Sequence, residues 1–149
     1  MDTSETYIKM CKQAKEIHTV RVLKIGDYFA YLNQFGYLVV GSDSFPETAR
    51  RIFAGGCLWL PRQDQLQEIY KMARDEDISG DTAPLNAIEI AGAFNDWLLS
   101  FTGKEPYSWL NDPTDIRGWV LPSMEQLWLA FVMEEKHGKI WTGSDWQLQ

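Results

Sequence analysis

The chain has 149 residues and a net charge of −7, and 45% of its residues are apolar against 23% charged. These values are typical of a globular protein and argue against an intrinsically disordered chain. The length favours one globular domain over residues 1–149. No stretch approaches the ~18 uninterrupted apolar residues of a membrane span, and the first residues lack the basic and apolar segments of a signal peptide. With only Cys11 and Cys57 as cysteines, a disulfide framework is disfavoured, and we expect a cytoplasmic protein without membrane contact.

The first residues have a helical pattern. Asp2 and Glu5 have the spacing of a helix start. Apolar residues then recur on one helical face, at Tyr7, Cys11, Ala14 and Ile17. This periodicity predicts an amphipathic helix at the beginning of the chain.

β-Branched and aromatic residues follow this helix. Residues 27–32 and 37–42 flank a four-residue loop, which predicts a β-hairpin, and residues 19–23 are a candidate third strand. Ser44 and Glu47 repeat the helix-start spacing and predict a short helix over residues 45–53.

One short phrase occurs twice. Residues 60–70 and 121–131 both fit the pattern Leu-Pro-x-x-acid-Gln-Leu-x-x-x-aromatic. In each copy, a proline that ends an apolar stub and an amphipathic pattern after it predict an extended segment followed by a helix. Leu66 and Leu127 hold matching places, so we expect both to be buried in one core. The hairpin before the first copy has no counterpart before the second, so the repeat is either a partial duplication or convergent local structure.

Two helices are predicted in the second half of the chain. Asn86 and Glu89 mark the start of the first helix. Its buried face is expected to consist of Ile88, Ala91, Phe94, Leu98 and Phe101. Ser123 and Gln126 cap the last helix. Its buried face is expected to consist of Met124, Leu127, Trp128 and Phe131. Residues 104–118, which contain two prolines, are predicted to form a long loop.

The predicted fold class is α+β, because the strands cluster early and the helices late. A small antiparallel sheet, made of the N-terminal hairpin and short strands, is expected to pack with four to five helices. Two of these helices follow the Leu-Pro phrases.

The sequence contains no recognisable catalytic or metal-binding motif. Glu134 and His137 have the Glu-x-x-His spacing of metal ligands, but a di-iron site needs a second such pair. His137 also precedes a glycine at the end of its helix, where a cation interacts favourably with the helix dipole. Cys11 and Cys57 lie among apolar residues, as inert core thiols do. We therefore expect no catalytic residue, no metal and no cofactor, and we favour a protein that is not an enzyme.

Negative charge is concentrated in the second half. Residues 1–74 carry ten Lys/Arg and eight Asp/Glu, a balance of +2, whereas residues 75–149 carry four and thirteen, a balance of −9. An acidic surface repels phosphate groups, so direct nucleic-acid binding is disfavoured. Solubility alone can account for the acidic excess, and mimicry of DNA charge is an alternative.

Five of the seven tryptophans lie in the acidic half, between Trp109 and Trp146. If the predicted loop and the tail meet, their indoles form an apolar centre with an acidic rim, as in a protein contact site. The candidate interaction surface consists of Trp109, Trp141, Trp146, Asp112, Asp115 and Asp145. In the alternative interpretation these tryptophans pack against the core and are structural.

Both Leu-Pro phrases also carry a resemblance. Residues 124–133 (MEQLWLAFVM), residues 138–141 and residues 59–66 resemble stretches of small hypothetical proteins from phages and prophages of Gram-positive bacteria. The resemblance implies a mobile-element origin and an intracellular location, and it implies no reaction, cofactor or catalytic residue.

Taken together, these features favour a non-enzymatic intracellular protein that acts through contact with a host or phage protein. Two alternatives stay open. One is a small hydrolase that uses carboxylates, and the other is an acidic DNA mimic that binds a host DNA-binding protein. The oligomeric state and the identity of the partner do not follow from the sequence.

Overall fold

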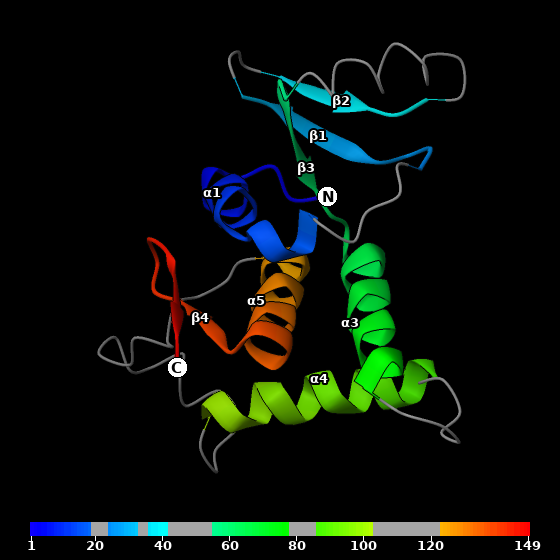
Figure 1. The fold of residues 1–149 in the computed structure, drawn as a ribbon, viewed down its shortest axis with the longest axis vertical. Coiled ribbons are helices and arrows are strands. Elements are labelled where there is room, and N and C mark those ends of the chain that lie inside the picture. The colour runs from blue at the N-terminus through cyan, green and yellow to red at the C-terminus, as the bar shows by residue number, and fades with distance from the viewer. Residues whose placement is uncertain (19–23, 33–35, 42–54, 78–85, 103–122) are drawn as a thin grey trace.

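A computed structural model describes residues 1–18, 24–32, 36–41, 55–77, 86–102 and 123–149 (Figure 1). The fold class is α+β, as predicted. The described elements, in chain order, are α1 (Glu5–Gln13), the 3-10 helix η1 (Lys15–His18), β1 (Tyr28–Tyr31), β2 (Tyr37–Val39), β3 (Cys57–Leu60), α3 (Gln63–Asp77), α4 (Ala87–Thr102), α5 (Met124–His137), β4 (Lys139–Trp141) and β5 (Trp146–Leu148). None of these helices is both long enough and apolar enough to cross a lipid bilayer.

A three-stranded antiparallel sheet forms one end of the molecule (Figure 1). Strand β1 lies in its centre and pairs with β2 and β3, so that Phe29 lies opposite both Leu38 and Trp59. The predicted hairpin is therefore confirmed. The apolar stub before the first Leu-Pro phrase supplies the strand on the other side of β1. The candidate strand at residues 19–23 and the short helix at 45–53 lie outside the described residues.

Helix α1 and η1 lie between the sheet and α5 (Figure 1). The four residues of their predicted apolar face are all buried, namely Tyr7, Cys11, Ala14 and Ile17. The predicted start was two residues early, because Ser4 is the N-cap and its hydroxyl accepts the backbone N–H of Tyr7. Asp2 is not the N-cap of α1. One of its carboxylate oxygens accepts the backbone N–H of Ser4 at 2.7 Å, and the other binds the beginning of α5.

Helices α3 and α5, which follow the two Leu-Pro phrases, run side by side in the same direction (Figure 1). The rings of Tyr70 on α3 and Phe131 on α5 are in contact, with centroids 4.6 Å apart. Leu66 is fully buried as predicted, whereas its counterpart Leu127 is only partly buried at the edge of the core. Both copies of the repeat therefore contribute a helix to the core, but the matching leucine is buried to a different extent in each copy.

Helix α5 is buried on more than the predicted face. Trp128 and Phe131 lie in the core as expected, but Met124 is exposed and was wrongly predicted to be buried. Five further residues of α5 are buried, namely Gln126, Leu129, Ala130, Val132 and Met133. Elements on several sides surround this helix (α1, α3, α4 and β4), so no single stripe describes its contacts.

Helix α4 lies across the ends of α3 and α5, at the bottom of Figure 1. Its core face is formed by Ile90, Phe94 and Trp97, and Phe94 stacks on Trp128 of α5 with centroids 4.1 Å apart. The predicted face was therefore wrong at Ile88 and Ala91, which are exposed. The cause is the larger aromatic area of Trp97, whose burial turns the helix toward that residue.

The chain ends in a second antiparallel sheet made of β4 and β5. Its indoles Trp141 and Trp146 face each other across the hairpin, with ring centroids 5.1 Å apart. An ion pair between Lys139 and Glu16 joins this hairpin to η1.

Candidate functional site

The tryptophan surface predicted from the sequence is only partly described. Trp109, Asp112 and Asp115 lie outside the described residues. Trp141 is buried, and Trp146 is half-buried with its indole N–H donating to the carbonyl oxygen of Met10 at 3.0 Å. The structure brings these two indoles together, and both contribute to the packing of the hairpin.

Asp145, the remaining member of that surface, is exposed in the turn between β4 and β5. Its carboxylate accepts the hydroxyl of Thr142, and this hydrogen bond lowers the pKa of Asp145. The observed role of Asp145 is therefore to order the turn.

The carboxylate of Glu134, considered above as a metal ligand, is bound to other side chains. One oxygen accepts the indole N–H of Trp97 and the other accepts the amide of Gln149, each at 3.0 Å. Partial burial lowers the pKa of His137. No group of three or more His, Cys, Asp or Glu side chains within the described ranges is arranged to hold a metal ion.

The two cysteines differ in their surroundings. Cys11 is fully buried on α1, and this burial raises the pKa of its thiol well above the ordinary range. Its thiol therefore stays protonated at neutral pH and is a poor nucleophile. Cys57 is half-buried in β3.

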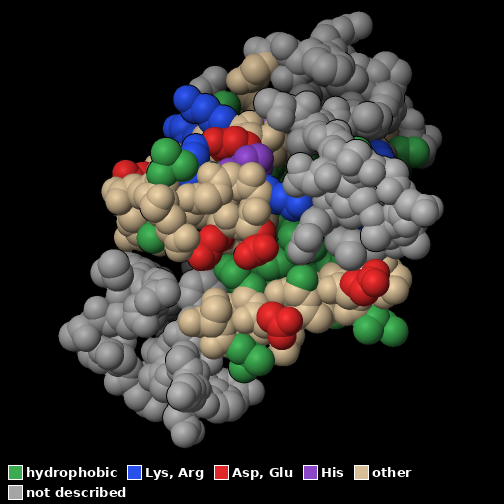
Figure 2. Space-filling view, turned by 60° about the horizontal axis from the view of Figure 1, so that its bottom comes forward, with side chains coloured by type: hydrophobic (Ala, Val, Ile, Leu, Met, Phe, Trp, Pro, Cys, Tyr) green, Lys and Arg blue, Asp and Glu red, His purple; other side chains and the backbone are tan. Residues whose placement is uncertain are grey.

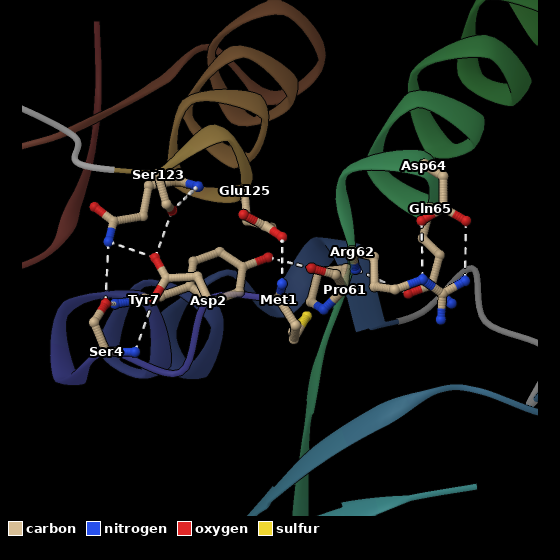
Figure 3. A network of polar contacts seen from close by, with 11 residues as sticks. Met1, Asp2, Ser4, Tyr7, Pro61, Arg62, Asp64, Gln65, Ser123 and Glu125 are labelled. Carbon is tan, nitrogen blue, oxygen red and sulfur yellow. Dashed lines mark hydrogen bonds and ion pairs between the residues drawn. The ribbon is translucent and has the colours of Figure 1, made fainter. Parts of the chain in front are cut away.

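A polar network surrounds the N-terminus of α5 (Figure 3). Asp2 accepts hydrogen bonds from the Ser123 hydroxyl and, at 2.7 Å, from the Gln126 amide. Burial by itself raises the pKa of Asp2, but the hydrogen bonds from Ser123, Ser4 and Gln126 outweigh it and lower the pKa. Because Ser123 also caps α5 through the backbone N–H of Gln126, the network ties the first residues to the start of that helix.

A second network lies at the N-terminus of α3. The Gln65 side chain accepts the backbone N–H of Arg62 at 2.9 Å and donates to the buried carboxylate of Asp27. Arg62 forms a two-pronged ion pair with Asp64, and this hydrogen bonding lowers the pKa of Asp64 (Figure 3). The hydroxyl of Tyr7 donates to the carbonyl oxygen of Pro61, between the two networks. Both networks position elements of the fold.

The outer face of α4, unlike the two polar networks, exposes large apolar side chains. Ile88 is 83% exposed and Leu99 is 48% exposed, and exposed Gly92 and Asn95 lie between them. At 3.6 residues per turn, these four positions fall within about 60° of arc, opposite the aromatic core face. We call this stripe of Ile88, Gly92, Asn95 and Leu99 the α4 seam.

Acidic residues border the α4 seam. Glu89 and Asp96 are exposed, each one position after a seam residue, and α4 contains no Lys or Arg. Figure 2, in which the bottom of the molecule is turned forward, shows hydrophobic and acidic side chains close together on this face. An exposed apolar surface with a polar rim is a feature of protein contact sites.

Sequence reasoning missed the α4 seam because it placed Ile88 in the core. The signal was nevertheless present, since the spacing from residue 88 to 92, 95 and 99 alternates between four and three residues. The resemblance to phage proteins stays a prediction. No protein-family model, no curated protein and no solved structure matches this chain.

Proposed function

We propose that the protein acts by binding another protein, with the α4 seam as its contact surface. One observation carries this proposal: two large aliphatic side chains, Ile88 and Leu99, are exposed on the helix face opposite an aromatic core. Full burial of such a side chain contributes about 1.5–3 kcal/mol. Because Ile88 is 83% exposed and Leu99 only 48%, a partner that covers both would gain about 2–4 kcal/mol from them.

The anchoring of α4 supports a contact role. Phe94 and Trp97 contact Phe131 of α5, each with ring centroids 5.4 Å apart, and Trp97 also donates to Glu134. A helix held in this way presents its outer face without rearrangement, which lowers the entropic cost of binding.

The hydrolase alternative draws no support from the described carboxyl groups. A general acid at neutral pH needs a raised pKa. The pKa of Asp2, Glu16 and Asp64 is instead lowered, by hydrogen bonds that outweigh burial in Asp2 and Glu16 and by the hydrogen bond from Arg62 in Asp64.

Position-specific photo-cross-linking tests the proposal. A photoreactive amino acid is placed at residue 88 or 99, and a matched control carries it at Leu148, which is 74% exposed on β5. In cells that express the protein natively, we expect one cross-linked protein species from residues 88 and 99 and none from residue 148. Equal products from all three positions, or no product from residues 88 and 99, would refute the contact surface.

A further inference from the structure

The α4 seam has the spacing of a helix–helix contact. Steps of four, three and four residues separate Ile88, Gly92, Asn95 and Leu99, and packed helices meet along seams of this kind. At 1.5 Å per residue, its aliphatic ends are about 16 Å apart, which is close to three helical turns. A second helix that lay along α4 would cover both ends at once.

The centre of the α4 seam is open. Apart from the helix backbone, no heavy atom of the described residues lies within 4 Å of the position that a Cβ of residue 92 would take. A partner side chain can therefore approach the backbone at Gly92 between the two aliphatic residues. This arrangement suits a large apolar side chain in the middle of the partner helix, because such a knob fits between seam residues.

The acidic residues beside the α4 seam favour a basic partner. Glu89 and Asp96 are seven residues apart, so they flank the seam on one side, where packed helices exchange ion pairs. Lys or Arg in the partner would pair with both carboxylates, whereas Asp or Glu would be repelled.

A second copy of this chain fits the α4 seam less well. In an antiparallel pair of copies, Glu89 and Asp96 would face the same carboxylates of the other copy. In a parallel pair they would face uncharged Ala91 and Leu98, without an ion pair. A net charge of −7 on each copy adds repulsion in both arrangements.

From this geometry we infer that the α4 seam binds a basic amphipathic helix of another protein, with an apolar stripe over the seam and Lys or Arg beside Glu89 and Asp96. The inference rests on the proposed function and specifies the class of partner.

Two synthetic peptides test the inference. Each forms a helix of about 18 residues, long enough to span α4. One has a leucine stripe flanked by lysines, and the other has the same stripe flanked by glutamates. Fluorescence anisotropy with the full-length protein is expected to show binding of the lysine peptide, at least tenfold weaker binding of the glutamate peptide, and weakening of the first complex by salt.

Variants of the α4 seam locate the binding. Ile88→Ser combined with Leu99→Ser, and separately Gly92→Leu, should each weaken the lysine peptide at least tenfold. Glu89→Gln combined with Asp96→Asn should make the affinity for the lysine peptide less dependent on salt, because both carboxylates are removed. The matched control on α3, Met72→Ser with Glu68→Gln, changes one exposed aliphatic and one exposed acidic residue and should leave binding unchanged. Circular dichroism melts verify that each variant is folded.

The outcomes separate this inference from the proposed function. Equal binding of both peptides, or binding that the seam variants leave unchanged, would overturn the inference. A homodimer in sedimentation that the seam variants dissociate would overturn it as well, in favour of a second copy. If cross-links form at residue 88 while the lysine peptide fails to bind, the contact surface stands and the partner class is wrong. If residues 88 and 99 form no cross-links, the proposed function itself fails.

Discussion

Gln65 and Gln126 occupy the same place in the two Leu-Pro phrases, and each donates its side-chain amide to an aspartate that is distant in the sequence. Gln65 binds Asp27, 38 residues away, and Gln126 binds Asp2, 124 residues away. Because α3 and α5 run in the same direction, their positive N-terminal ends lie at the same end of the helix pair (Figures 1 and 3). The two carboxylates therefore interact favourably with the two helix dipoles. In both copies, the glutamine of the repeated phrase binds an earlier segment of the chain to the start of a helix.

Removal of the Gln126 amide should destabilise the fold. Gln126 is fully buried, and Gln126→Ala leaves Asp2 without one of its donors. A hydrogen bond to a charged group is worth about 1.5–3 kcal/mol, so we expect a loss of unfolding free energy in that range. Urea unfolding measures it. The control is Gln147→Ala, which removes only a long, exposed hydrogen bond to Asp145 (3.4 Å) and should change the unfolding free energy by no more than about 0.5 kcal/mol. An unchanged urea midpoint for Gln126→Ala would contradict the docking role.

Asp2 should make stability depend on pH. Its pKa is lowered in the folded state, so the unfolded state binds more protons in acid. The stabilisation that the Asp2 carboxylate contributes is complete above its unfolded pKa of about 3.9. It is lost as the pH falls through the lower pKa of the folded state. We expect Asp2→Asn to be less stable than the wild type at pH 7 and to lose stability less steeply below pH 4. Parallel urea titrations at several pH values test this, and curves of identical shape would rule out the effect.

The matching leucines should differ in their effects. Leu66 is fully buried, so Leu66→Ala should cost about 2–5 kcal/mol of unfolding free energy. Leu127 is partly buried, so Leu127→Ala should cost less than about 2 kcal/mol. Denaturant midpoints of the two variants give the comparison. Equal losses would mean that the two copies are equivalent in the core.

Substitutions on the two faces of α4 should differ in their effect on the unfolding free energy. Ile90 is buried, so Ile90→Ala should cost about 2–5 kcal/mol. Ile88 is exposed, so Ile88→Ser should change the unfolding free energy by no more than about 0.5 kcal/mol. Thermal unfolding of both variants tests this prediction. A large destabilisation by Ile88→Ser would mean that Ile88 is buried in the core.

The features that the sequence predicted well depend on contacts between near neighbours. The cap of α5 joins Ser123 to the backbone N–H of Gln126, and Asn86 and Glu89 bind each other's backbone N–H groups at the start of α4. The β1–β2 hairpin likewise joins adjacent segments. Periodicity also identified the buried face of α1, because that helix packs along one stripe.

The sequence by itself therefore determined the α+β class, most helix starts and the hairpin, since these depend on contacts within a few residues. The tertiary structure alone decided that α4 buries Ile90 and Trp97 and exposes Ile88, because both stripes have helical spacing and only the aromatic side chains of α5 distinguish them. It also decided the pairing of Gln126 with Asp2, which neither residue's neighbours indicate. The candidate contact surface belongs to this second group, because a face becomes an outer face only when the rest of the chain has packed against the opposite one.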